Sequence, residues 1–151
     1  MRTIKFRGLN QFGVFVFGSY VTDGKDYHAI ITENPKDSST MLNIIVVQSS
    51  VGQFTGLQDK NGVDIYEGDI VAILFTDWAS QSKDDTRSLE EYKQSKERVF
   101  PICFNTGCFQ ISELCKYGDD FAYGDISCGT HGHIRVIGNI HQNPELLGLN
   151  K

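Results

Sequence analysis

Three side chains near the C-terminus are the sharpest candidates for chemistry. Cys128, His131 and His133 lie close together, and a thiolate with two imidazoles is a ligand set that zinc accepts. Their spacing matches no recognised zinc signature, so a polar loop that carries a thiol is the alternative interpretation. A cysteine nucleophile paired with His28 or His141 is a further hypothesis, but the sequence identifies neither a base nor an oxyanion donor for it. We therefore assign no metal, no cofactor and no catalytic residue.

Two groups of charged residues could also act on ligands. Glu67 and Asp69 flank the start of an apolar run beside Tyr66, where two carboxylates could act as an acid–base pair. Turn caps and solvated charges are the commoner roles of such residues, and we favour them here. A set of basic residues could gather on one face and contact phosphate groups. The members of this set are Arg2, Lys5, Arg7 and Arg135.

Aromatic side chains are the candidates for a ligand-binding surface. Small β-barrels bind peptides and nucleic acids through grooves lined by aromatic rings. We select Tyr66, Trp78 and Phe109 as residues of such a surface, provided that their rings face solvent. Packing in the core is the alternative for each of them.

The composition favours one domain with its own core. The chain has 151 residues, of which 40% are hydrophobic and 22% charged. The net charge of −5 lacks the broad positive field that non-specific nucleic-acid binding uses, so we expect a protein partner rather than nucleic acid. No apolar run approaches the roughly 20 residues of a membrane span, and the N-terminus lacks a signal-peptide core. We expect a cytoplasmic protein with no membrane contact.

The pattern of apolar residues predicts many short strands. Strands are predicted over residues 4–7, 14–17, 28–32, 69–75, 99–104, 108–111 and 134–140. Asn61 and Gly62 predict a tight turn with positive φ angles. The nearly continuous apolar run 41–47 is typical of a strand buried on both faces, inside the fold or at a subunit contact. We expect a mainly β protein that forms a homo-oligomer.

Residues 76–98 interrupt this pattern. They are rich in charges of both signs, which predicts a solvated polar insertion. Ser88 and Glu91 have the spacing of a capping box, which predicts one short helix near 89–98, with a long loop as the alternative. Pro144, followed by Glu145, predicts a second short helix at the C-terminus.

Three segments of the chain resemble the YopX family, whose members are encoded mostly by bacteriophages and prophages. They are IKFR at 4–7, QFTGLQDKNGVDIYEGDIV at 53–71 and VIGNIHQNPELL at 136–147. The resemblance implies a single domain over 1–151, with an SH3-like β-barrel in the C-terminal two thirds (51–147). It also implies an N-terminal strand region (1–50) with a role in oligomerisation.

The resemblance implies no catalytic residue, cofactor or ligand, because the family has no assigned function. We therefore expect a non-enzymatic phage or prophage accessory protein that binds a host or phage macromolecule. A nucleic-acid-binding oligomer and a metal-dependent or cysteine enzyme are the alternatives.

Overall fold

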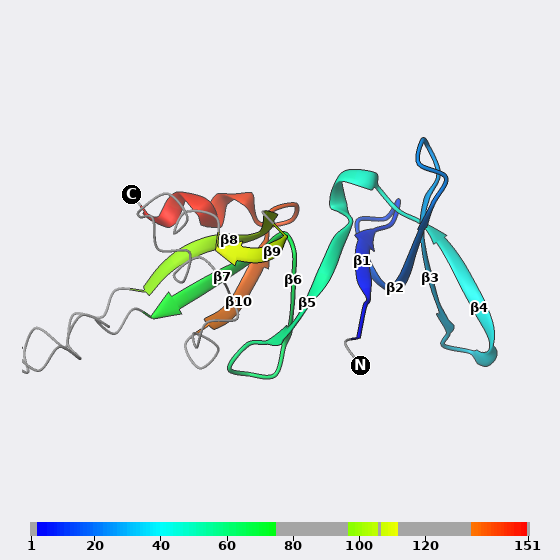
Figure 1. Ribbon diagram of the computed structural model, residues 1–151, viewed down its shortest axis with the longest axis horizontal. Coiled ribbons are helices and arrows are strands. Elements are labelled where there is room, and N and C mark those ends of the chain that lie inside the picture. The colour runs from blue at the N-terminus through cyan, green and yellow to red at the C-terminus, as the bar shows by residue number, and fades with distance from the viewer. Residues whose placement is uncertain (1–2, 75–96, 106, 112–133, 151) are drawn as a thin grey trace, which may run out of the picture.

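Strands dominate the computed structural model, which describes residues 3–74, 97–105, 107–111 and 134–150. Within these ranges the strands form two antiparallel sheets, with the orders β4-β3-β2-β1-β5-β6 and β10-β7-β8-β9. The elements are β1 (Phe6–Leu9), β2 (Phe15–Thr22), β3 (His28–Asn34), β4 (Asp37–Ile45), η1 (Gln48–Ser50), β5 (Gly52–Gln58), β6 (Asp64–Tyr66), β7 (Asp69–Leu74), β8 (Glu97–Asn105), β9 (Cys108–Ile111), β10 (Ile134–Asn139) and η6 (Pro144–Asn150). Figure 1 shows the two sheets side by side, with β5 and β6 between them.

The first sheet begins as a meander of consecutive strands, β1 to β4, and is completed by strands that follow later. β1 pairs with β2 on one side and with β5 on the other, so Arg7 lies opposite both Phe17 and Gly52. The insertion of β1 between a neighbour in sequence and a strand more than forty residues away brings the N-terminus to the middle of the molecule. Arg7 of β1, and Lys5 just before it, consequently face residues of β7 and β6.

The prediction that the run 41–47 is buried on both faces is wrong within a single chain. The segment forms the second half of β4, which is the outer strand of the first sheet (Figure 1). Met41 is 59% exposed and Ile45 is 57% exposed, whereas Val46, just beyond the strand, is buried. An apolar run is buried on both faces only when it is a central strand of a covered sheet. β4 is at the edge and has one neighbouring strand, so its apolar side chains remain partly exposed.

The two faces of β6 contact different parts of the molecule. Its side chains alternate, as strand geometry requires, so Asp64 and Tyr66 face β1 while Ile65 faces the second sheet. Ile65 belongs to the hydrophobic core of the second sheet. The other buried members of that core are Val71, Ile73, Phe100, Ile102, Phe109, Ile111 and Ile134.

The turn between β5 and β6 ties the two sheets together. Gly62 has a φ of 80°, as the Asn61-Gly62 pair predicts. The Asp59 carboxylate accepts hydrogen bonds from the backbone N–H groups of Asn61 and Val63 within the turn, and from that of Val136 in β10 at 3.0 Å. Burial alone would raise the pKa of Asp59, but these backbone N–H donors outweigh burial and hold the pKa below its usual range.

Replacing Asp59 by asparagine is expected to destabilise the fold by about 1–3 kcal/mol. The amide oxygen can still accept from Asn61 and Val63, which share Oδ1, but an NH2 group would then face the N–H of Val136. Because the folded-state pKa of Asp59 is lowered, its contribution is complete at neutral pH and is lost as the pH falls through the acidic range.

Urea unfolding of the wild type and of Asp59→Asn checks this expectation at neutral pH and below about pH 4, where an ordinary aspartate titrates. The difference in unfolding free energy should shrink in acid. Asp26→Asn, at an exposed position, is the matched control. A difference that is independent of pH would contradict the role of the Asp59 carboxylate.

The remaining predicted elements have different outcomes. The end of the predicted helix near 89–98 is wrong, because Glu97 and Arg98 begin β8 and pair with Leu74 and Ile73. The rest of that helix and most of the polar insertion lie outside the described residues. The predicted C-terminal helix is confirmed as η6, which begins at Pro144. No helix in the described ranges is long and apolar enough to cross a membrane.

Candidate functional site: a cleft between the two sheets

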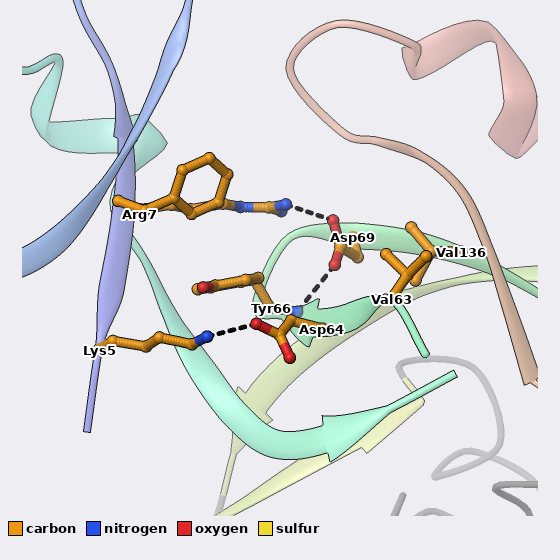
Figure 2. Close-up of a pocket in the computed structure, with 8 residues that line it drawn as sticks. Lys5, Arg7, Val63, Asp64, Tyr66, Asp69 and Val136 are labelled. Atoms are coloured by element: carbon orange, nitrogen blue, oxygen red, sulfur yellow. Dashed lines mark hydrogen bonds and ion pairs between the residues drawn. The ribbon is translucent and has the colours of Figure 1, made fainter. Parts of the chain in front are cut away.

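A cleft of about 410 Å³ lies where the first sheet meets the second. Figure 2 shows that its lining residues come from segments that are far apart in the sequence. They are Lys5, Arg7, Phe17, Val63, Asp64, Tyr66, Asp69 and Val136. A volume of this size is within the range of small-ligand sites, which is roughly 300–1,000 Å³.

Tyr66 lies between two cations in this cleft (Figure 2). The guanidinium carbon of Arg7 is 5.0 Å from the centre of the Tyr66 ring, and Nζ of Lys5 is 5.8 Å from it. Arg7 also lies over Phe15, at 4.6 Å, and Lys5 lies over Phe54, at 4.5 Å. Each cation therefore gains a contact with the negative face of two aromatic rings, which stabilises a charge that is partly removed from water.

A buried ion pair joins β1 to the start of β7. Nη1 of Arg7 is 2.5 Å from Oδ1 of Asp69, and Oδ2 of Asp69 accepts a hydrogen bond from the Tyr66 N–H at 2.8 Å. Burial raises the pKa of Asp69 above its usual range, although Arg7 and the Tyr66 N–H oppose this shift. Nη2 of Arg7 donates to the carbonyl of Glu67, whereas Nε of Arg7 is buried with no acceptor among the described residues.

A second ion pair lies nearer to solvent. Lys5 donates to Asp64, and both side chains are partly exposed. The hydrogen bond to Asp64 raises the pKa of Lys5, against the effect of burial. Burial would raise the pKa of Asp64, but Lys5 and Gln58 outweigh it and lower the pKa. The four charges of the cleft are therefore arranged as two neutral pairs.

Local sequence explains how these residues meet. Lys5 immediately precedes β1, and the alternation of the extended chain places it on one face with Arg7; alternation along β6 does the same for Asp64 and Tyr66. Gly52 lies opposite Arg7, and a Cβ at position 52 would be 2.4 Å from the Glu67 carbonyl oxygen. The missing side chain of Gly52 allows the Glu67 backbone to approach β1 and to accept from Arg7.

The aromatic residues selected from the sequence have separate places. Tyr66 lines the cleft, where burial raises the pKa of its hydroxyl. Phe109 is buried in the core of the second sheet and its ring contacts Phe104. Its role is therefore the alternative that the sequence left open, packing in the core. Trp78 lies outside the described residues. Sequence reasoning missed Phe17, which contacts Tyr66 with ring centres 5.5 Å apart.

The predicted charged sites are brought together only in part, since Lys5 and Arg7 both line the cleft. Asp69 pairs with Arg7 and caps the Tyr66 N–H, which agrees with the capping role expected of it. Arg135, expected on one face with Lys5 and Arg7, instead pairs with Glu97 at 2.9 Å. Arg2 lies outside the described residues.

The two histidines considered as catalytic bases lie in different surroundings. The ring of His28 is buried, and its nitrogens contact the Tyr20 hydroxyl and the Lys25 carbonyl. His141 is half-buried, and burial and then the positive charge of Arg7 lower its pKa. Cys128, His131 and His133 lie outside the described residues. Within the described ranges, no three metal-binding side chains form a group that could hold an ion.

The arrangement of two joined β-sheets is found in a solved protein. The chain is similar to protein EF1440 from Enterococcus faecalis, whose crystal structure superposes with a TM-score of 0.52 at 23% sequence identity. The match covers 97% of this chain and 99% of that one, so it defines a shared fold over the whole chain. A family model described as YopX protein matches residues 5–148. The chain therefore belongs to the YopX family. No curated protein matches it.

Proposed function

We propose that this chain is a non-enzymatic accessory protein of a phage or prophage, and that it acts in the host cytoplasm as a binding module for a protein partner. The observation that carries this proposal is the lining of the cleft between the two sheets. Its cations and carboxylates are already paired, and Phe17 and Val63, each about half exposed, offer apolar contact area.

The pairing of charges favours an uncharged segment of protein over a polyanion. A phosphate group would have to compete with Asp64 for Lys5, and with the buried Asp69 for Arg7. An apolar side chain meets no such competition, because it can pack against Phe17 and Val136 without separating an ion pair. Aromatic residues in a pocket are also the commonest anchors of protein interfaces.

The second sheet, together with β5 and β6, is proposed to form an SH3-like barrel. Two contacts support this description: the Lys60 N–H donates to the Ile134 carbonyl at 3.0 Å, and the Val136 N–H donates to Asp59. They place the β5–β6 turn against the edge strand β10, which is how a barrel would begin to close. Barrels of this kind bind extended peptides in aromatic grooves, which agrees with the proposed partner class.

Phe17→Ser is expected to weaken capture of the protein partner by about tenfold or more, as loss of an anchor residue does. The test is affinity capture of partners from nuclease-treated lysate of the bacterium that carries the gene, with quantitative mass spectrometry. Phe12→Ser is the matched control, because Phe12 is 78% exposed in a turn and does not line the cleft, whereas Phe17 is 49% exposed.

Comparing the partners captured by the wild type, Phe17→Ser and Phe12→Ser tests whether the cleft binds a protein. A stoichiometric protein recovered by wild type and Phe12→Ser, but lost with Phe17→Ser, supports the cleft as its binding site. Equal recovery with Phe17→Ser contradicts that role. Filter binding of the wild type to DNA or RNA at low salt, abolished by Lys5→Ala, would replace the protein partner with nucleic acid.

A further inference from the structure

One buried donor in the cleft has no acceptor among the described residues. The Arg7 side chain is 8% exposed, and Figure 2 shows that it extends from β1 to Asp69. Its Nη1 and Nη2 are paired with Asp69 and with the Glu67 carbonyl, whereas its Nε is covered and unpaired. A buried N–H without an acceptor costs free energy, so native structures contain few of them, and each needs an explanation.

The aromatic rings around Arg7 stabilise its charge without supplying that acceptor. The guanidinium carbon is 4.6 Å from the centre of the Phe15 ring and 5.0 Å from that of the Tyr66 ring. A guanidinium group carries its N–H donors in its own plane, so an acceptor for Nε approaches along the edge of the group. The Nε–H therefore defines a place for one ligand atom in the lining of the cleft.

Phe17 is the neighbour whose movement gives a ligand access to this donor. It lies opposite Arg7 in the pair of β1 and β2, so the two side chains share a face of the first sheet. About half of Phe17 is exposed, and exposed side chains change rotamer within nanoseconds. A ligand in the cleft thus reaches Nε by displacing the ring of Phe17, and both ion pairs stay intact.

We propose that the cleft recognises a backbone amide carbonyl, which accepts a hydrogen bond from the Arg7 Nε–H while an adjacent apolar side chain packs against Phe17 and Val63. This inference rests on the proposed function, because it names the chemical group by which a protein segment occupies the cleft. Sites for small ligands commonly combine apolar walls with a few fixed polar groups, and the Nε–H is such a group here.

The charges around Arg7 select a neutral acceptor over an anion. Asp69 is buried and is already bound to the same guanidinium group. A carboxylate or phosphate on Nε would place a second negative charge close to Asp69, in surroundings where water screens the repulsion only weakly. An amide oxygen adds no net charge, and a polypeptide backbone offers one at every residue.

NMR titration of the full chain with small amides tests the contact, because the Arg7 Nε–H of isotope-labelled protein gives a signal of its own. N-methylisovaleramide is a neutral analogue of a peptide bond with an apolar group attached. Isovalerate has the same branched carbon chain but is an anion. With the amide, the Arg7 signal is expected to move to lower field and to saturate, with a Kd of roughly 1–10 mM for a ligand of this size. Isovalerate at equal concentration should leave the signal in place.

Arg7→Lys and Arg135→Lys are the matched variants. Arg7→Lys keeps a positive charge beside Asp69 but removes the Nε donor, so it should weaken amide binding about tenfold, as followed by the backbone signal of Tyr66. Its spectrum also identifies the Arg7 signal by its disappearance. Arg135 pairs with Glu97 and does not line the cleft, so Arg135→Lys should bind the amide as the wild type does. The wild-type titration decides the proposal if Arg7→Lys does not fold.

An Arg7 signal that ignores the amide, or that responds equally to isovalerate, would overturn the amide site. An equal response of the exposed Arg135 N–H would overturn it as well. Loss of the captured partner in Phe17→Ser, combined with an unresponsive Arg7 signal, would keep the cleft as a protein-binding site and remove the amide contact. A saturable response of Arg7 with no partner captured would keep the amide contact and remove the protein partner.

Discussion

Replacing Arg7 by methionine should lower the free energy of unfolding by about 3–5 kcal/mol, because it leaves a buried carboxylate without its counter-ion. Asp69 is 1% exposed, and in the wild type its charge is balanced by Arg7 at 2.5 Å. Methionine has a similar length and can still pack against Phe15 and Tyr66. Urea unfolding followed by fluorescence gives the loss directly.

The penalty of Arg7→Met should depend on pH in a defined direction. Burial already holds the pKa of Asp69 above its usual range, and removal of Arg7 raises it further. Because a protonated carboxyl needs no counter-ion, the difference from wild type should be largest at neutral pH and should shrink as the pH falls.

Two further variants separate the buried pair from ion pairs in general. Arg135→Met breaks the exposed pair with Glu97 and is expected to cost less than about 1 kcal/mol. The double variant Arg7→Met with Asp69→Asn keeps an acceptor for the Tyr66 N–H and should be more stable than Arg7→Met alone. If Arg7→Met cost no more than Arg135→Met at neutral pH, Asp69 would not be a buried, unpaired carboxylate in the variant, and the predicted penalty would be contradicted.

Replacing Ile65 by alanine is the second large effect, with an expected loss of about 2–5 kcal/mol. Ile65 is fully buried, and it is the residue through which β6, a strand of the first sheet, enters the core of the second. A cavity at this position therefore weakens the contact between the sheets as well as the core. Thermal and urea unfolding should still show one transition, shifted to lower stability.

A graded series checks that packing is the cause. Ile65→Val should cost about 0.5–1.5 kcal/mol, and Ile4→Ala, at a largely exposed position, should change stability by no more than about 0.5 kcal/mol. A loss in Ile65→Ala no larger than that in Ile4→Ala would contradict the packing role of Ile65.

Local pattern in the sequence was sufficient for most of the strands. The strand from residue 69, the turn at Asn61-Gly62 and the short C-terminal helix all follow from nearby residues, and the structure has them. Burial of the run 41–47 inside the fold is a wrong prediction, because apolarity alone does not distinguish a central strand from an edge strand. The neighbours of a strand decide that question, and they depend on contacts distant in sequence.

The cleft could not be predicted in the same way. Arg7 and Asp69 are more than sixty residues apart, and nothing near either residue shows that β1 pairs with β5. The one available signal was alternation: Lys5 and Arg7 share a face of a strand that is otherwise apolar. Charged residues on one face of a short strand indicate either solvent or a counter-ion, and the sequence alone does not choose between them.

The central position of β1 also determines what would happen if the chain were divided. A break between η1 and β5 would separate β1 from the strand on one of its two sides, and each ion pair of the cleft would lose one member to the other piece. The N-terminal piece would keep β1 and the two cations, and the C-terminal piece would keep β5 and the two carboxylates. The unpaired strand edges and the unbalanced charges of the two pieces would therefore be complementary. Such halves satisfy the requirements of a split protein, in which reassembly of the fold rebuilds the binding site at the seam.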